Sequence, residues 1–423
     1  MLIRSLAPPV YPVTSFQLPT AQITTFSNGA KLHVLKGSSQ PVIKFEIVFK
    51  AGKRYETKKG ISFLAAKMLL EGSEKYSAKE IADKIAFYGA SLECNQGFDH
   101  SSLTLYCLSK HFKDIFPLIV EIVNNSTIPV QELELLKTRT IQNIAIEKEK
   151  NSYLATSLLT KNIYGAHHPY VTSQEEVDVD SITRDDILAF IENSYRTEAA
   201  IYFLTGDITK EQEDRIQLAF DKTFINNLTA ETFDVPQSSE RNLFLEKSDK
   251  LQSSIRIGSS WPLMQHPDYP KLALLNKILG GYFGSRLMKN IREEKGFTYG
   301  ISSALSPKEK DTLFYIGTDI NYQNTDETIQ EVKKEITKLQ EEHISTEELE
   351  TMKNYTIGKF INETTSIFDQ SEKYKNTVLK SLSSNYYSIY LNNLRNTSPT
   401  EILDLAGFYF DLTKLHYVVV GKR

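Results

Sequence analysis

The chain has 423 residues, more than one hydrophobic core usually serves, so its length predicts two domains of about 200 residues each. Hydrophobic residues make up 40% and charged residues 24%, the composition of an ordinary globular protein. The net charge of −4, with lysine and glutamate interspersed, excludes a basic face for nucleic acid or an anionic membrane.

The sequence also favours one compartment. It has no continuous apolar run of the length that a signal peptide or a membrane span requires, so we expect a cytoplasmic protein. Cys94 and Cys107 are its two cysteines, and the strand pattern places them on neighbouring strands. A cross-strand disulfide would fit this placement, but two free, unreactive thiols are the preferred prediction.

The first half alternates short strands with longer helices, after an extended arm over residues 1–20. Helices, several of them closed by a glycine, are predicted over residues 61–72, 78–89, 113–124, 130–149, 155–164 and 185–195. Strands are predicted over residues 31–35, 42–50, 90–96, 101–108 and 200–205. Ser77 is the expected N-cap of the second helix. We expect the first two strands to pair as a hairpin and the next two to join at a turn around Gly97 and Asp99.

The second half contains a helix–helix–strand segment with clear boundaries. Leucines at helical spacing stop at Gly280 and Gly281, residues that tolerate positive φ. A second helix should begin with Ser285 as its N-cap and end before Gly296. Over residues 297–302, large apolar residues alternate with small ones, which predicts a strand.

Arg292 and Tyr299 flank the turn between that helix and that strand. A guanidinium and a phenol that converge can donate hydrogen bonds to a peptide carbonyl, and more strongly to the oxyanion that forms when the carbonyl is attacked. The alternative is an arginine at a helix end and a tyrosine packed in a strand, neither with a chemical role. On the residues alone, the alternative is the more common case.

The two halves repeat one another. IPVQELELLKTRTI at 128–141 matches ISTEELETMKNYTI at 344–357 at seven of fourteen positions, with an offset of 216. The repeat predicts an α+β fold with an internal duplication, each unit an antiparallel or mixed β-sheet backed by helices. We place the first domain at residues 1–222, a linker at 223–248 and the second domain at 249–423.

Five segments are similar to one known family. They are NGAKLHVL at 28–35, FKAGKRYETKKGISFLAAKMLLEGS at 49–73, YGASLECNQGFDHSSL at 88–103, YGAHHPY at 164–170 and, most specifically, NKILGGYFGSRLMKNIREEKGFTYGISS at 276–303. Together they resemble the pitrilysin or insulinase-type zinc peptidases, peptidase family M16, in the shorter form shared with the mitochondrial processing peptidase. The resemblance implies two domains of one fold that clasp a substrate chamber.

The chain departs from this family at the zinc site. Active members carry H-x-x-E-H in one helix. In this chain Phe63 and Lys67 stand at the two histidine positions, and Ala66 stands at the glutamate position. None of these side chains can hold zinc or activate a water molecule, so the resemblance implies no metal in this chain. The family's third ligand falls near Glu147 or Glu149, which without the other ligands are more simply solvated helix residues.

No other group of residues replaces the lost site. None of the eight histidines forms a one-turn pair with another metal ligand on a predicted helix. His167 and His168 are adjacent in a predicted loop, so we expect them to form a structural turn before Pro169. The chain also has no G-x-S-x-G nucleophile elbow.

The resemblance implies a role beside a second chain. In two-chain members one subunit holds the zinc, while the other keeps the arginine and tyrosine that hold the substrate carbonyl, and Arg292 and Tyr299 match that pair. We therefore expect a non-catalytic, substrate-positioning subunit of a heterodimeric zinc endopeptidase, inactive alone, whose H-x-x-E-H partner carries the zinc. The alternative is a purely structural or binding protein, like the core subunits of a respiratory complex. An active peptidase with an unrecognised site is the least favoured reading.

The resemblance also implies where a peptide substrate would lie. Family members add the substrate as an extra strand to an exposed sheet edge in the first domain. The matching segment here is Ser91-Leu92-Glu93-Cys94-Asn95. Strand addition uses main-chain hydrogen bonds, so it tolerates varied peptides or unfolded segments. The alternatives are an internal strand, or an edge that a loop covers.

Overall fold

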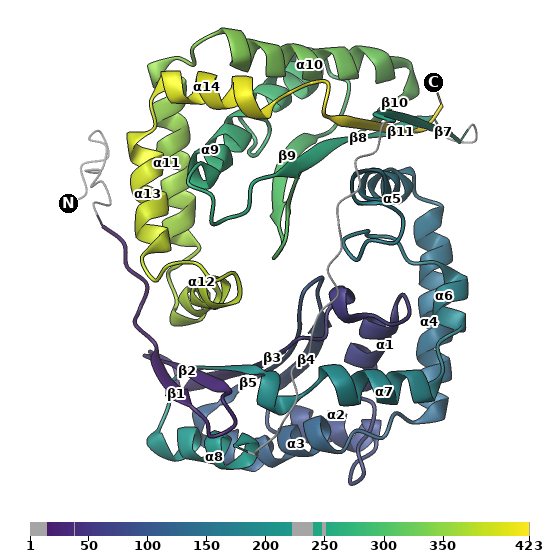
Figure 1. Cartoon of the computed structure of the whole chain (residues 1–423), viewed down its shortest axis with the longest axis vertical. Helices are drawn as coiled ribbons and strands as arrows, with labels where there is room; N and C mark the ends of the chain where they lie inside the picture. The colour runs from purple at the N-terminus through teal and green to yellow at the C-terminus, as the bar shows by residue number, and fades with distance from the viewer. Residues whose placement is uncertain (1–14, 38, 222–239, 248–250, 423) are drawn as a thin grey trace, which may run out of the picture.

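Two halves, each a β-sheet backed by helices, face each other in the protein (Figure 1). The structure, a computed structural model, describes residues 15–37, 39–221, 240–247 and 251–422. Most of the predicted N-terminal arm and most of the predicted linker lie outside the described residues. Within those ranges, none of the helices combines the length and the apolar character that a membrane crossing requires.

The first sheet contains six strands in the order β1-β2-β6-β3-β5-β4. Their bounds are β1 Gln22–Thr25, β2 Lys31–Lys36, β3 Val42–Phe49, β4 Ser91–Gln96, β5 Ser101–Leu108 and β6 Ile201–Gly206. β2 and β6 are parallel, and the other pairs are antiparallel.

The predicted hairpin of the first two long strands is wrong, because β6 lies between β2 and β3 and pairs with both. Strands that follow one another in sequence usually pair, and that expectation fails here. Seven of the eight residues of β3 are buried, so this strand needs a neighbour on each side, and β6 supplies one of them from the far end of the domain.

Eight α-helices accompany this sheet. They are α1 Ile61–Met68, α2 Ala78–Phe87, α3 Phe112–Asn124, α4 Val130–Lys148, α5 Asn151–Tyr164, α6 Glu176–Asp180, α7 Arg184–Ser194 and α8 Lys210–Phe220. Ser77 caps α2 as predicted, in a capping box with Glu80. The apolar faces of sheet and helices form one core, which contains stacked rings such as those of Phe45 and Tyr202.

The second sheet has the order β7-β11-β8-β10-β9. Its strands are β7 Asn242–Glu246, β8 Gln252–Trp261, β9 Ile301–Pro307, β10 Thr312–Asn321 and β11 His416–Gly421. Its helices are α9 Tyr269–Leu279, a π-helix Met288–Glu294, α10 Thr325–Glu341, α11 Thr346–Asn362, α12 Ile367–Leu379, α13 Tyr386–Asn396 and α14 Pro399–Tyr409. β7 falls inside the stretch predicted as linker, where polar neighbours conceal a strand of only five residues.

The two sheets are copies of one arrangement. Without β1, the order β2-β6-β3-β5-β4 corresponds strand for strand to β7-β11-β8-β10-β9, including a parallel pair at the same edge. The helices α4 and α11 begin at residues 130 and 346, and α5 and α12 begin at 151 and 367, an offset of 216 in both cases. These correspondences agree with the duplication that the sequence predicts.

The duplicated helices α5 and α12 exchange partners between the halves. α5, from the first half, packs on β8 and β11 of the second sheet, and it forms a separate apolar cluster with residues such as Leu313 and Val418. α12, from the second half, packs on β6 of the first sheet. There His33 Nδ1 lies 2.8 Å from the Tyr374 hydroxyl, and Lys375 Nζ lies 2.7 Å from Glu46 Oε1. Each half therefore packs its copy of the duplicated helix, α5 or α12, against the sheet of the other half.

Candidate functional site

The helix that carries the altered zinc motif is α1, which packs against the edge strand β4. Ala66 is fully buried, Phe63 packs against the first core, and Lys67 is exposed. A methyl group and a phenyl ring offer no lone pair to a metal, and an ammonium group is a donor only. The residues at these positions therefore do not fit a zinc ion.

The glutamates near the family's third ligand position serve elsewhere. Glu147 forms an ion pair with Lys150 at 2.5 Å, and Glu149 forms one with Lys247 at 3.4 Å. Among the residues that the structure describes, no three His, Cys, Asp or Glu side chains gather as metal ligands.

The histidine turn and the cysteines are structural. His168 Nδ1 accepts a hydrogen bond from the backbone N–H of Tyr170 at 3.0 Å, which stabilises the turn around Pro169 as predicted. Cys94 and Cys107 are free, as preferred from the sequence. Both thiols are buried, and burial raises the pKa of each to about 12, which makes them poor nucleophiles at neutral pH.

The predicted substrate strand lies on β4, at the outer end of the first sheet. The alternative of an internal strand is therefore wrong. Along β4, Ser91, Glu93 and Asn95 are exposed, Leu92 is half-buried and Cys94 is buried. Among the described strands, only β5 pairs with β4. Peptide binding at this edge stays a prediction.

Arg292 lies in a stretch of π-helix, in which the N–H of residue i+5 donates to the carbonyl of residue i, as the Lys295 N–H does to the Asn290 carbonyl at 3.0 Å. π-Helical turns are rare and often mark functional sites.

The predicted cap is wrong, because the Ser285 hydroxyl makes no hydrogen bond in the described part of the chain. The predicted stop is confirmed by Gly296, whose φ of +67° suits glycine. The Arg292 guanidinium lies over the Phe283 ring, 4.6 Å from its centroid.

Tyr299 lies in the loop before β9, not in the strand predicted over residues 297–302, because β9 begins only at Ile301. Its side chain is 96% exposed, which rules out the alternative of a tyrosine packed in a strand. Neighbouring Thr298 fixes the loop: its hydroxyl donates to the Asp319 carbonyl at 2.8 Å and accepts from the Gly300 N–H at 3.1 Å. The sequence pattern gave no indication of this anchor.

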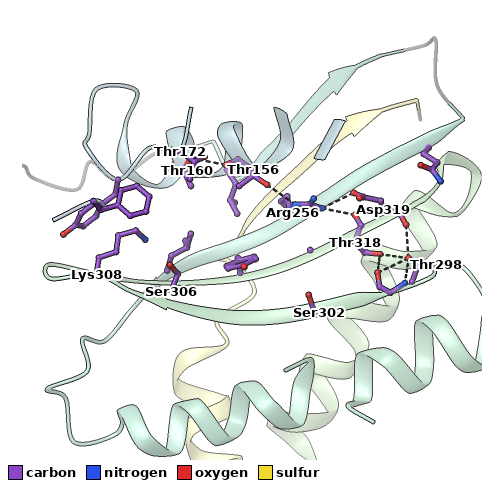
Figure 2. A pocket seen from close by; sticks show the side chains of 18 of the residues that line it. Thr156, Thr160, Thr172, Arg256, Thr298, Ser302, Ser306, Lys308, Thr318 and Asp319 are labelled. Carbon is purple, nitrogen blue, oxygen red and sulfur yellow. Dashed lines mark hydrogen bonds and ion pairs between the residues drawn. The ribbon is translucent and has the colours of Figure 1, made fainter. Parts of the chain in front are cut away.

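Tyr299 stands at the rim of a cavity of about 720 Å³ between the two halves, which we name the interdomain cavity. The first half contributes Phe98, Thr156, Leu159, Thr160, Tyr170 and Thr172, and the second half contributes residues of β8, β9, β10 and the loops beside them. Figure 2 shows Arg256 and Thr298 toward one end of this cavity and Lys308 at the other. Arg292 is not among the described residues that line it. The pairing of Arg292 with Tyr299 on one substrate stays a prediction.

Arg256 joins the halves across this cavity. From β8 it donates to the Thr156 hydroxyl on α5 at 3.2 Å, and it also donates to the Thr318 carbonyl at 3.1 Å. The Asp319 carboxylate lies 3.3 Å away. These partners satisfy the guanidinium, so its part is to hold α5 on the second sheet.

Lys308 lies at the tip of the β9–β10 hairpin and is 6% exposed. Its ammonium lies between 5.2 and 5.3 Å from the ring centroids of Phe98, Tyr164 and Tyr170, all in the first half. Burial lowers the pKa of Lys308 to about 8, and the nearby Asp311 carboxylate offsets only part of this effect. Neither Lys308 nor Arg256 has a sequence motif that would have identified it as part of a site.

This buried lysine predicts a pH-dependent stability. Below pH 8 Lys308 is protonated in both the folded and the unfolded chain, whereas between pH 8 and 10.5 the unfolded chain binds more protons. The free energy of unfolding should therefore rise with pH across this window, by up to about 3 kcal/mol, and Lys308→Met should remove that rise. Urea unfolding at each pH gives the free energy of unfolding of wild type and of Lys308→Met. In the difference between these two free energies the contributions of the tyrosine titrations cancel. Lys310→Met, on the exposed part of the same turn, should keep the wild-type slope, and parallel curves for wild type and Lys308→Met would contradict the prediction.

The chain matches two descriptions of one family. Residues 34–170 match "Insulinase (Peptidase family M16)", and residues 181–356 match "Peptidase M16 inactive domain". The second match begins in the first half, before α7, and extends into the second half. Together the two matches include α1, β4 and the segment from Arg292 to Tyr299.

Similar proteins carry both active-type and inactive-type names. The chain is 24% identical to an uncharacterized zinc protease, YmxG, of Bacillus subtilis, over 80% of this chain and 83% of that protein. It is 22% identical to a non-peptidase homolog, YmxG, of Helicobacter pylori, over 94% of this chain and 93% of that one. In fold it is similar to a crystal structure of a peptidase M16 inactive domain from Pseudomonas fluorescens, with a TM-score of 0.86 at 22% identity, covering 95% of this chain and 98% of that one.

Proposed function

Because the chain belongs to peptidase family M16 and lacks the residues that hold zinc, we propose that it is the substrate-positioning subunit of a heterodimeric zinc endopeptidase. The partner subunit carries H-x-x-E-H, the zinc ion and the activated water. This chain contributes Arg292 and Tyr299, which donate hydrogen bonds to the carbonyl under attack. We place this assembly in the cytoplasm, and its substrates are peptides or unfolded segments.

One observation carries the proposal: the chain has lost every H-x-x-E-H residue but keeps an exposed tyrosine on a fixed loop. Tyr299 is 96% exposed, and within the described residues its hydroxyl has no hydrogen-bond partner. An exposed aromatic side chain whose hydroxyl has no intramolecular partner adds little to the stability of the fold. Its hydroxyl is therefore free to serve a ligand or a partner chain, which supports a role in trans.

The first domain gives the same proposal a path for the substrate. The outer edge of β4 is next to α1, the helix that holds the zinc site in active members. A peptide added to β4 would run past the altered motif, where Phe63 and Lys67 offer contacts but no catalysis. In this subunit the edge then serves to hold the substrate, and cleavage takes place at the partner.

Co-expression with an H-x-x-E-H relative from the same genome tests the proposal. We expect the two chains to co-purify with one zinc ion per heterodimer, and chelator-sensitive peptide cleavage only when both are present. Metal analysis of each chain alone is the control, with zinc expected in the partner only. Stoichiometric zinc in this chain, with chelator-sensitive cleavage by this chain alone, would sink the proposal.

The second candidate is a purely structural or binding protein. The non-peptidase designation of the Helicobacter pylori relative favours it. In that case this chain would assemble with other proteins, but the turnover of any peptidase beside it would not depend on Arg292 or Tyr299. A partner that co-purifies without acquiring peptidase activity would support this candidate.

A further inference from the structure

A second cavity, of about 470 Å³, lies inside the second half and is separate from the interdomain cavity. We name it the second-domain cavity. It is bounded by α9, β9, α11, α12 and α13. Its polar and aromatic walls include Asn276, Lys277, Lys359, Glu363, Lys373, Lys380, Tyr269, Tyr386, Tyr387 and Tyr390.

The duplication places this cavity at the counterpart of the zinc site. β4 and β9 begin at residues 91 and 301, an offset of 210, and the same offset aligns α1 with α9 so that buried Leu64 and Leu69 fall on buried Leu274 and Leu279. It carries the altered zinc-motif positions 63, 66 and 67 onto Ala273, Asn276 and Lys277, which all line the cavity. The helix offset of 216 carries Glu147 onto Glu363, which lines it too.

Two buried polar groups in this wall lack partners. Asn276 is 4% exposed and Tyr386 is 8% exposed, and neither the Asn276 Oδ1 atom nor the Tyr386 hydroxyl has a hydrogen-bond partner among the described residues. A buried polar atom left unpaired costs about 1–3 kcal/mol, so native proteins rarely keep one without a use. A ligand in the cavity would satisfy both groups.

The charge of the wall is positive. Four lysines face one carboxylate, Glu363, which Lys359 and Lys373 share at 3.7 and 3.5 Å. Lys277 and Lys380 instead donate to backbone carbonyls, those of Gly281 and Pro307, at 2.9 and 3.1 Å. Burial lowers the pKa of both lysines. The charge of Lys359 adds to the effect on Lys277, whereas the carboxylates of Asp99 and Glu309 offset part of the effect on Lys380. An anion beside Lys277 would relieve its repulsion by Lys359.

The form of the donors indicates the kind of anion. The described lining residues contain lysines but no arginine and no glycine-rich loop, the groups that usually grip a phosphate from several sides. Glu363 in the wall also disfavours a doubly charged ligand. The N-terminus of α13, which the Asn385 side chain does not cap, adds a positive dipole end beside Tyr386 and Tyr387.

We propose that the second-domain cavity binds a carboxylate of a peptide, either an acidic side chain or the C-terminal group. Lys277 and Lys380 pair with the carboxylate, and the Tyr386 hydroxyl donates to it. The Asn276 Oδ1 atom accepts a hydrogen bond from a backbone N–H of the same peptide, and the tyrosine rings cover the adjoining residue. The duplicated fold would thus keep the pocket of the zinc site in both halves and use the second copy to hold an acidic peptide. This inference takes the ligand class, peptides, from the proposed function, but it does not require a catalytic partner.

Binding to the purified chain alone tests it, which separates its failure from failure of the proposed function. The probes are a short fluorescent peptide with one glutamate and an amidated C-terminus, its glutamine version, and the glutamine version with a free C-terminal acid, each measured by anisotropy. We expect the glutamate or the free acid to increase affinity, and whichever does so identifies the source of the carboxylate. Lys277→Met and Lys380→Met should each remove about ten- to hundredfold of that gain.

Controls keep the result interpretable. Lys113→Met removes an exposed lysine of the first half and should leave binding unchanged. Asn276→Asp keeps the side-chain shape and adds a negative charge, so it should abolish the preference for the acidic peptide while thermal unfolding reports an intact fold. Equal affinity for all three peptides, no effect of the lysine variants, or competition by inorganic phosphate with no carboxylate preference would each overturn the proposal.

Discussion

Tyr299→Phe is expected to lower the kcat of the assembled heterodimer by about 10²- to 10³-fold, because it removes one donor from the oxyanion that forms on the substrate. The change deletes only a hydroxyl. Since Tyr299 is 96% exposed and that hydroxyl has no partner within the described residues, the fold, the assembly and the zinc content should stay as in the wild type. Steady-state kinetics measures the turnover, metal analysis the zinc content and size-exclusion chromatography the assembly. The loss should appear in kcat rather than in KM.

Arg292→Ala should cause a loss of similar size. The guanidinium lies over the Phe283 ring, so part of its packing is local and the variant needs a matched control. Lys289→Met provides one, because Lys289 is an exposed cation on the same π-helix. It should keep the wild-type kcat. If both the arginine and the tyrosine variants turn over at the wild-type rate in an intact complex, the two residues have no part in catalysis and the chain is a scaffold.

Local patterns predicted the individual elements well. The Ser77 cap, the glycine stop at Gly296 and the strand pair β4–β5 follow from residues within one turn of each boundary, and the structure confirms them. The β2–β3 hairpin failed because β6, about 160 residues later, pairs with both strands. The helix ends at Gly280 as predicted, but not because of a positive φ, since its φ is −154°. Glycine is needed there because a Cβ would lie 2.8 Å from the Ser303 backbone N.

The sites were harder to predict because their residues come from distant segments. The loss of zinc ligands at Phe63, Ala66 and Lys67 is visible in one helix, so the sequence predicted it. The interdomain cavity, in contrast, needs α5 from one half on β8 and β11 of the other, and no spacing in the sequence encodes that exchange. For the second-domain cavity a signal did exist, since the duplication aligns Lys67 with Lys277, but it becomes useful only once the strand offset of 210 is known.

A side chain at Gly206 is expected to be costly to the fold. Gly206, at the end of β6, has a φ of +122°, and a Cβ atom there would lie 2.1 Å from the carbonyl oxygen of Val42. The contact cannot relax easily, because that oxygen also accepts a hydrogen bond from the Asp207 N–H at 3.1 Å. Backbone strain and overpacking act together, so Gly206→Ala should reduce the free energy of unfolding by about 4 kcal/mol or more.

Gly421, the repeat counterpart of Gly206, should respond in the same direction but less strongly. Its φ is +143°, and an added Cβ would lie 2.5 Å from the hydroxyl oxygen of Ser253 and 2.7 Å from the Ser253 Cα, so its closest backbone contact is longer than the 2.1 Å at Gly206. Gly358 is the control: it lies within α11 with no atom within 4 Å of an added Cβ, so Gly358→Ala should stabilise the protein by about 0.5–1 kcal/mol. Urea unfolding of the three variants, followed by circular dichroism, gives the order. A Gly206→Ala protein as stable as wild type would show that β6 can move away from β3 without cost, which its place between two strands of the first sheet argues against.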